Sequence, residues 1–281
     1  MRFLILNKLN IYLNKIIKQI NNYRIQFTIA SRLPEKYKKV ISNNIKFKDC
    51  HKNTTAYIIA SGPSLKNQNL LNLEGELIFC VNSFFKHEHI KKLNPRYVFF
   101  LDPNLFNFTT IKKSDFYTNA KKMYNNSIFF LPLFRGYRSV IKNQILPIDK
   151  CQFVAFGGVD SCDINIDTVI PNFHGVGAFA LATAVYMGCS PIYLLGFDHD
   201  YLANRGVNHH FYEGSTVDIP NFTEPLLGER VPYDEEMITN YNLWQNYRSI
   251  LKIAKRKNIK IYNATKGGYL DIFEFANIDF L

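Results

Sequence analysis

Short apolar runs alternate with stretches of helical spacing from Thr54 to the end of the chain. Runs of this length, bounded by Gly, Pro, Asn, Asp and Ser, are typical of buried strands. Two helices are clear, an Ala-rich apolar one over 177–187 that ends at Gly188 and an amphipathic one within 234–257. The predicted strands are 57–60, 76–81, 97–101, 127–131, 152–156, 191–196 and 259–263. This alternation predicts an α/β fold with a Rossmann-like, doubly wound and mainly parallel sheet.

The basic charge of the chain is concentrated at its N-terminus. Residues 1–52 hold twelve Lys and Arg and only two acidic residues, whereas basic and acidic residues nearly balance in the rest of the chain. Within residues 3–29, apolar side chains recur at helical spacing, at Leu9, Leu13, Ile16, Ile17 and Ile20. The sequence therefore predicts a basic helical appendage over residues 1–52, with an amphipathic helix, and a Rossmann-like domain over residues 53–281.

A basic amphipathic helix is suited to an anionic membrane surface, where each Lys or Arg contributes roughly 1 kcal/mol. The alternative is a helix that packs on the domain or on a second copy of the chain as a homo-oligomer. Nucleic acid is not an expected partner, because no basic stripe with interleaved aromatic residues continues into the body.

Several classes of protein are disfavoured by what the sequence lacks. There is no run of 18 apolar residues and no pattern typical of a signal peptide. The five cysteines are scattered without a C-x-x-C pair, which favours reduced thiols in a cytoplasmic protein. We therefore expect a cytoplasmic protein that is peripheral on the inner membrane.

Polar residues follow four of the predicted strands. In an open parallel sheet, ligands bind outside the carboxyl ends of the strands, and a tight loop there can cradle a phosphate. Each of these residues also suits an ordinary turn, but their coincidence at one edge favours a binding site. The residues are Ser61, Gly62, Pro63 and Ser64 after the first strand, Asn82 after the second, Asp102 after the third and Asp198 after the strand at 191–196.

Two further patterns lie at that edge. Gly175, Val176 and Gly177 open the Ala-rich helix, where glycines allow a ligand to approach a positive helix terminus or simply allow close packing. Asp198 and Asp200 form a D-x-D pattern, which in many transferases holds a divalent metal. Asp198 is equally suited to accept hydrogen bonds from the backbone of a loop.

The segment 200–233 is predicted to be a lid. It is long for a loop without secondary structure and contains two adjacent histidines, His209 and His210. A histidine over the pocket is a natural general base, whereas the alternative is an exposed or structurally satisfied side chain. No G-x-G-x-x-G fingerprint, P-loop or G-x-S-x-G elbow is present, which disfavours NAD, Walker-type ATP binding and hydrolase chemistry.

The motifs at these strand ends resemble those of the sialyltransferases of glycosyltransferase family 42. They are also similar to motility-associated flagellin glycosyltransferases and to 6-hydroxymethylpterin diphosphokinases. The resemblance covers roughly residues 55–275. The residues that carry it are Ile58–Lys66, Cys80–Asn82, Phe100–Phe106, Gly175–Asp198 and Asn263–Gly268.

The resemblance implies a donor activated by cytidine monophosphate (CMP), such as CMP-sialic acid or a related nonulosonate. It implies nucleotide and sugar contacts from Ser61, Gly62, Ser64, Asn82 and Asp102, and phosphate contacts from Tyr201 or Tyr212. It also implies a lid histidine as general base, for which position favours His210 first and His209 second. Transferases of this family need no metal.

We therefore predict an inverting glycosyltransferase that transfers a sugar from a CMP-sugar to a hydroxyl of a bacterial surface glycan or lipid-linked acceptor. The helix start at Gly175–Gly177 would stabilise the leaving phosphate. The alternative is a magnesium-dependent diphosphokinase that acts on a pterin-like alcohol with ATP, with Asp102, Asp198 and Asp200 on the metal. A third possibility is a binding module without catalysis.

Overall fold

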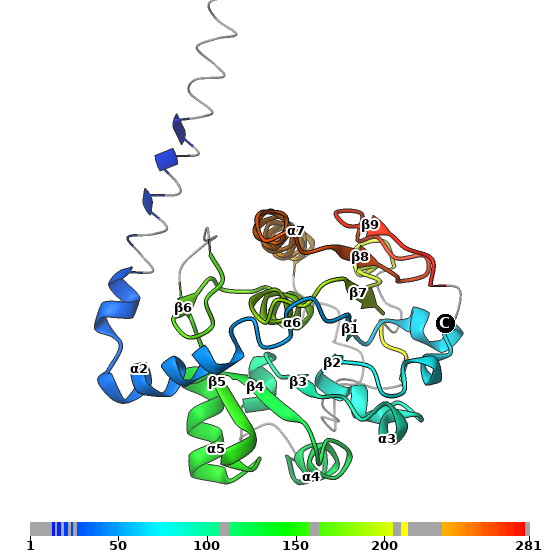
Figure 1. Ribbon diagram of the computed structural model, residues 1–281, viewed down its shortest axis with the longest axis horizontal. Helices are drawn as coiled ribbons and strands as arrows, with labels where there is room; N and C mark the ends of the chain where they lie inside the picture. Colours follow the sequence, from blue (N-terminus) through cyan, green and yellow to red (C-terminus); the bar gives the residue numbers. More distant parts are fainter. Residues whose placement is uncertain are drawn as a thin grey trace, which may run out of the picture.

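The computed structural model describes residues 27–106, 113–157, 163–204, 209–212 and 232–278, with scattered positions between 13 and 24. In this part of the chain, nine strands form one sheet in the order β6-β5-β4-β3-β2-β1-β7-β8-β9 (Figure 1). The strands are β1 Ala56–Ile59, β2 Ile78–Val81, β3 Tyr97–Phe99, β4 Ile128–Pro132, β5 Cys151–Phe156, β6 Val169–Ile170, β7 Ile192–Leu195, β8 Ile261–Asn263 and β9 Glu274–Phe275.

Every pair of neighbouring strands in the sheet is parallel, which confirms the predicted fold class. β1 is central, with β2 on one side and β7 on the other. The four residues of β1 are all buried, as expected for a strand covered on both faces. Because the chain leaves β1 in one direction for β2 and returns beside it much later as β7, the switch point of the topology lies between β1 and β7.

Helices cover both faces of the sheet, with α6 and α7 on one face and α3, α4 and α5 on the other (Figure 1). α6 is hydrophobic all round and almost wholly buried, and Gly188 follows its end with a φ of +78°. Both predicted helices are thus confirmed. The α-helices are α2 Glu35–Ser42, α3 Ile90–Leu93, α4 Lys113–Met123, α5 Arg138–Asn143, α6 Val176–Tyr186 and α7 Tyr233–Arg256.

Tight helical turns follow several strands at the carboxyl edge of the sheet. Sequence periodicity did not predict them, since a single turn carries no repeat. The same holds for β6 and β9, which have two residues each. The turns after strands are η2 Pro63–Asn67, η4 Asn82–Lys86, η5 Pro103–Phe106 and the π-helical turn η6 Leu133–Tyr137, whereas η1 Asn43–Phe47, η3 Leu70–Leu73 and η7 Ile148–Lys150 come before β1, β2 and β5.

The segment before β1 packs against the body of the domain. Leu33, Ile41 and Phe47 are buried in its two apolar cores. The buried side chain of Asn44 donates hydrogen bonds to the carbonyl oxygens of Phe153, at 2.8 Å, and Ile166, at 2.9 Å. The division between residues 52 and 53 stays a prediction, but part of the predicted appendage contributes to the core.

Much of the predicted amphipathic helix and of the predicted lid lies outside the described residues. The described positions between 13 and 24 are helical, as are residues 27–32. In the lid, only residues 200–204, 209–212 and 232–233 are described. None of the helices in the described part of the chain is long and apolar enough to cross a membrane.

Candidate functional site

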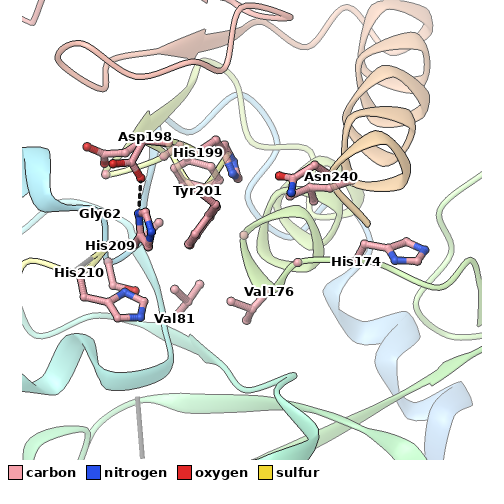
Figure 2. Close-up of a pocket in the computed structure, with 18 of the residues that line it drawn as sticks. Gly62, Val81, His174, Val176, Asp198, His199, Tyr201, His209, His210 and Asn240 are labelled. Atoms are coloured by element: carbon pink, nitrogen blue, oxygen red, sulfur yellow. Dashed lines mark hydrogen bonds and ion pairs between the residues drawn. The ribbon is translucent and has the colours of Figure 1, made fainter. Parts of the chain in front are cut away.

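A cavity of about 340 Å³ opens at the carboxyl ends of β1, β2 and β7, at the switch point of the sheet. The start of α6 and the first turns of α7 complete its walls. In Figure 2, His209 and His210 lie on one side of this cavity, with Asn240 and His174 on the other and Val81 and Val176 between them. Sites of this size and position are typical of small-molecule binding in α/β folds.

Ten of the predicted residues line this cavity, so the structure brings most of the predicted site together. They are Ser61, Gly62, Asn82, Gly175, Val176, Gly177, Asp198, Tyr201, His209 and His210. Pro63, Ser64 and Tyr212 do not line it, and Asp102 lines a neighbouring cavity instead.

The loop after β1 is held to the loop after β7 by one carboxylate. Asp198 accepts a hydrogen bond from the backbone N–H of Ser64 at 3.0 Å and another from its hydroxyl at 2.8 Å. A Cβ atom on Gly62 would lie 1.7 Å from the Asp198 carboxylate, so only glycine allows this approach. Burial raises the pKa of Asp198, although the bonds from Ser64 lower it. Asp198 therefore shapes the loop, as one of the two sequence interpretations predicted.

The N-terminus of α6 faces the cavity without a side-chain cap. Gly175 is the N-cap residue in an extended conformation, and no side-chain cap bonds to the first N–H groups of the helix within the part of the chain that the structure describes. A Cβ on Gly177 would lie 2.6 Å from the ring of Phe197, so this glycine is required for packing. The unsatisfied N–H groups and the helix dipole together favour an anion at this point.

His209 is oriented by a carboxylate. Its Nδ1 lies 2.9 Å from Oδ1 of Asp200, and Asn204 donates to the other oxygen of Asp200 at 3.1 Å. Burial raises the pKa of Asp200, but the hydrogen bonds from Asn204 and His209 outweigh it and lower the pKa below its usual value. The ionised carboxylate fixes the proton of His209 on Nδ1, which leaves Nε2 as the nitrogen that accepts a proton.

His210 is held in a different way. Its ring stacks on the ring of Tyr212 at a centroid distance of 4.9 Å. The ammonium group of Lys86 lies over the Tyr212 ring, 4.6 Å from its centroid. The next residue, Phe211, donates its backbone N–H to the carbonyl of Ser61 at 2.9 Å. Burial and the nearby His209 lower the pKa of His210. The segment 209–212 is therefore anchored to the loop after β1.

Tyr201 packs beside the histidine pair, with its ring centroid 4.7 Å from that of His209. Tyr201 is 37% exposed, and partial burial together with the carboxylates of Asp200 and Asp198 raises the pKa of its hydroxyl above the usual value. Its hydroxyl stays protonated at neutral pH and can donate a hydrogen bond to an anion.

His199 is a site residue that the sequence interpretation missed. Its Nε2 lies 2.9 Å from the hydroxyl of Tyr247, and its buried Nδ1 has no hydrogen-bond partner among the described residues. Burial lowers the pKa of His199 to about 4, so the ring is neutral at physiological pH. The residue also has a φ of +49°. The only signal in the sequence was its place inside the D-x-D pattern.

Asn82 combines a strained backbone with an unpaired acceptor. Its φ is +45°, in the left-handed region that asparagine tolerates better than most residues. Its side-chain Oδ1 is buried and lacks a hydrogen-bond partner in the described part of the chain. A buried polar atom of this kind is costly unless a water or a ligand satisfies it.

A second cavity of about 430 Å³ adjoins the first. The two share Asn82, His174, Gly175 and Val176, so the start of α6 forms the wall between them. The second cavity is lined in addition by Leu101, Asp102, Pro103, Pro132, Arg135 and Phe173. The strand-end residues therefore lie at one edge of the sheet, as predicted, but they are divided between two neighbouring cavities.

The three aspartates at the ends of the strands have separate surroundings in the described structure. Asp198 bonds to Ser64, Asp200 bonds to His209 and Asn204, and Asp102 lines the other cavity. Within the described residues, no group of three or more His, Cys, Asp or Glu is placed to hold a metal ion. The described residues therefore do not bring Asp102, Asp198 and Asp200 together as the diphosphokinase alternative expects.

A family model described as "6-hydroxymethylpterin diphosphokinase MptE-like" matches residues 28–204. This match spans more than half of the chain, so the protein belongs to that family. It confirms one of the resemblances that the strand-end motifs predicted. No curated protein matches the chain in sequence.

Solved structures that are similar to this chain include sialyltransferases, another of the three groups that the motifs resemble. The monofunctional α-2,3-sialyltransferase Cst-I from Campylobacter jejuni is 16% identical, over 81% of this chain and 82% of that chain, with a TM-score of 0.47. The sialyltransferase CST-II, in complex with a trisaccharide acceptor and CMP, is 14% identical, over 80% of this chain and 87% of that chain, with a TM-score of 0.46.

Proposed function

We propose that the protein is a glycosyltransferase that moves a nonulosonate such as sialic acid from a CMP-activated donor to a hydroxyl of a bacterial surface glycan. The observation that carries this proposal is one cavity that holds both a carboxylate-oriented histidine, His209, and the uncapped start of α6. The first is a general base and the second is a site for a leaving phosphate, and this transfer needs both.

His209 is the better candidate for the base, because its tautomer and orientation are fixed by Asp200. In the proposed step, the acceptor oxygen bonds to the anomeric carbon while the bond from that carbon to the phosphate oxygen of CMP breaks. The hydroxyl proton passes to Nε2 of His209, and CMP leaves as an anion. The N–H groups at the start of α6 and the hydroxyl of Tyr201 stabilise its phosphate.

The nucleotide preference tests this proposal. We expect CMP to raise the melting temperature without magnesium, and UDP, GDP and ATP to have smaller effects under the same conditions. If ATP stabilised the protein, and did so only when magnesium is present, the proposal of a CMP-sugar donor would be rejected.

The role of His209 is tested by its replacement with Gln. Transfer, or hydrolysis of the donor where no acceptor is known, should fall by about 10²- to 10⁴-fold while CMP still binds. His210→Gln is the matched control and should retain more activity. The reverse order would return the base to His210, and unchanged turnover in both would reject a histidine base.

A magnesium-dependent diphosphokinase remains the second candidate, favoured by the family match over residues 28–204. It would bind ATP with magnesium and transfer a diphosphate to an alcohol. The pairing of Asp198 and Asp200 with other side chains argues against it. The nucleotide panel separates the two candidates.

We further propose that the N-terminal helix holds the enzyme in the cytoplasm against an anionic inner membrane. Residues 1–26 contain five Lys and Arg and no acidic residue. Leu13, Ile17 and Ile20 recur at helical spacing and are each about half exposed, at 47%, 54% and 53%. Vesicles with anionic lipids should float the intact chain but not a chain that lacks residues 1–26, and equal flotation would reject the proposal.

A further inference from the structure

Aromatic side chains hold the segment 209–212 in place. These four residues form no helix or strand, so their position depends on their contacts with the rest of the protein. The ring of Phe211 meets two rings from the chain after β2 edge to face, at centroid distances of 5.9 Å to Phe84 and 5.4 Å to His87. The segment that carries both site histidines is therefore supported by a pair of rings that line neither cavity.

The turn that supports Phe211 also contributes to the first cavity. η4 begins at Asn82, which lines the cavity, and carries Phe84, which is completely buried. His87 follows this turn in an extended conformation and donates its backbone N–H to the carbonyl of Phe84 at 2.9 Å. Its ring stacks on that of Phe84 at a centroid distance of 5.2 Å. A wall residue of the cavity and the support of Phe211 thus come from one short stretch of chain.

The hydrogen bonding of His87 requires a neutral ring. Its Nδ1 accepts the backbone N–H of His89 at 3.2 Å, which leaves the ring proton on Nε2. A second proton on Nδ1 would turn this acceptor into a donor that faces another donor. It would also place a charge against the apolar rings of Phe84 and Phe211. The contacts of His87 therefore favour the neutral ring.

The surroundings of His87 act in the same direction. Burial and the nearby imidazole of His89 lower the pKa of His87, and the carboxylate of Glu88 opposes them. The ring is therefore largely neutral at pH 7. The charged and titratable groups around it are Lys86, Glu88 and His89 beside it in the chain, and His209, His210 and Tyr212 in the segment that packs against it.

We propose that His87 is a positioning residue that holds Phe211 through its neutral ring and thereby keeps the site histidines at the cavity. His87 does not line the cavity, so it acts through the segment 209–212 and not on a ligand. The inference rests on the proposed function for the task of the two histidines. The anchoring of the segment, however, can be measured without any substrate.

The first test follows hydrogen exchange of the Phe211 amide by NMR on the full chain, since this amide donates to the carbonyl of Ser61 at 2.9 Å. His87→Ala should lower its protection about ten-fold, because the support of an aromatic ring is lost. His87→Phe should keep the protection, since a phenyl ring can make the same ring contacts. His89→Ala is the matched control, because it removes the neighbouring imidazole but keeps the backbone N–H that His87 accepts.

Wild-type protection in His87→Ala would overturn the proposal, and so would an equal loss of protection in His89→Ala. If His87→Ala is too unstable to measure, His87→Leu takes its place, because leucine keeps apolar volume without a flat ring. It should show a similar loss, and wild-type protection in this variant would overturn the proposal in the same way.

The second test repeats the exchange measurement at about pH 7.5 and about pH 5.5, on either side of the usual histidine pKa of 6.5. The Ala60 amide, which donates to Leu195 at 2.8 Å, serves as the reference. Relative protection of Phe211 should fall at the lower pH, because a released His87 gains a proton. His210 titrates in the same segment, so His87→Phe isolates the part due to His87 and should lose less protection. Equal losses in wild type and His87→Phe would overturn the requirement for a neutral ring.

The third test connects the anchor to the reaction. His87→Ala should lower kcat for transfer, or for donor hydrolysis, about ten-fold with little change in KM, because the histidines are placed less precisely while the nucleotide contacts remain. His87→Phe should restore most of the rate, and His89→Ala should leave it unchanged. Reduced protection of Phe211 with an unchanged kcat would reject the positioning role. Failure of CMP to bind the wild-type protein would instead reject the proposed function and leave the exchange results standing.

Discussion

The two neighbouring cavities differ in how their polar side chains are satisfied. In the first, both aspartates have partners within the protein, Asp198 in Ser64 and Asp200 in His209, whereas Nδ1 of His199 and Oδ1 of Asn82 have none among the described residues. In the second, Arg135 and one oxygen of Asp102 have no partner among the described residues. Paired groups are fixed in place before a ligand arrives, whereas unpaired groups gain their bonds from it. The pairing of the two aspartates supports the proposed placement of the reaction in the first cavity.

The largest expected effect on stability comes from Gly62→Ala, which would disrupt the hydrogen bonds between Ser64 and Asp198 beside the first cavity. The new Cβ would lie 1.7 Å from the Asp198 carboxylate and would force it away from Ser64. We expect the free energy of unfolding to fall by about 3 kcal/mol, measured by urea denaturation.

Gly75→Ala is the control for this substitution. Gly75 has a φ of +85° but nothing within 4 Å of its added Cβ, so only backbone strain of roughly 1–2 kcal/mol applies. A loss for Gly62→Ala no greater than this would show that the Asp198 contact is not tightly held.

The second prediction concerns pH. The pKa of His199 is lowered to about 4 from an ordinary value of 6.5, so the unfolded chain binds the proton more readily. Stability associated with the neutral ring is present above pH 6.5 and is lost as the pH falls toward 4. Between pH 7 and pH 5 the loss should be about 2 kcal/mol.

His199→Asn should remove this pH dependence, because asparagine has no titrating group and tolerates the φ of +49°. The measurement is the difference in unfolding free energy between wild type and variant at the two pH values. A difference that stays constant from pH 7 to pH 5 would mean that His199 is not buried as a neutral ring.

Ser64→Ala should have a smaller effect. It removes the hydroxyl bond to Asp198 at 2.8 Å but keeps the bond from the backbone N–H. The expected loss is about 1 kcal/mol. Ser61→Ala is the control, since the bond of Ser61 to Phe211 uses its backbone carbonyl. Equal losses in the two variants would argue that the hydroxyl of Ser64 contributes nothing specific.

The smallest effect is expected in the second cavity. Because Arg135 has no partner in the described part of the chain, Arg135→Gln should change the free energy of unfolding by less than about 0.5 kcal/mol. A loss as large as that of Ser64→Ala would mean that Arg135 stabilises the folded protein, and the contrast between the cavities would then disappear.

The sheet and its ligand edge could be predicted because both depend on local signals. Buried parallel strands read as apolar runs, and the residues after them share one edge by topology. Asp198 and Ser64 are 134 residues apart in the sequence. The sequence therefore predicted that Asp198 could accept hydrogen bonds from the backbone of a loop, but not that Ser64 would donate them. Arg135 was missed because no pattern marks it, and His199 because its only signal was its place inside the D-x-D pattern. The directions of both side chains depend on tertiary packing.

The contacts of Asn44 have a consequence for the order in which the chain takes shape during synthesis. This residue lies near the N-terminus, but the carbonyls that receive its amide belong to residues 109 and 122 positions later. On the ribosome its first acceptor is absent until residue 153 has emerged, and its second until residue 166 has emerged. The segment around Asn44 is therefore synthesised early, but it can form these hydrogen bonds only after β1 to β5 have been synthesised.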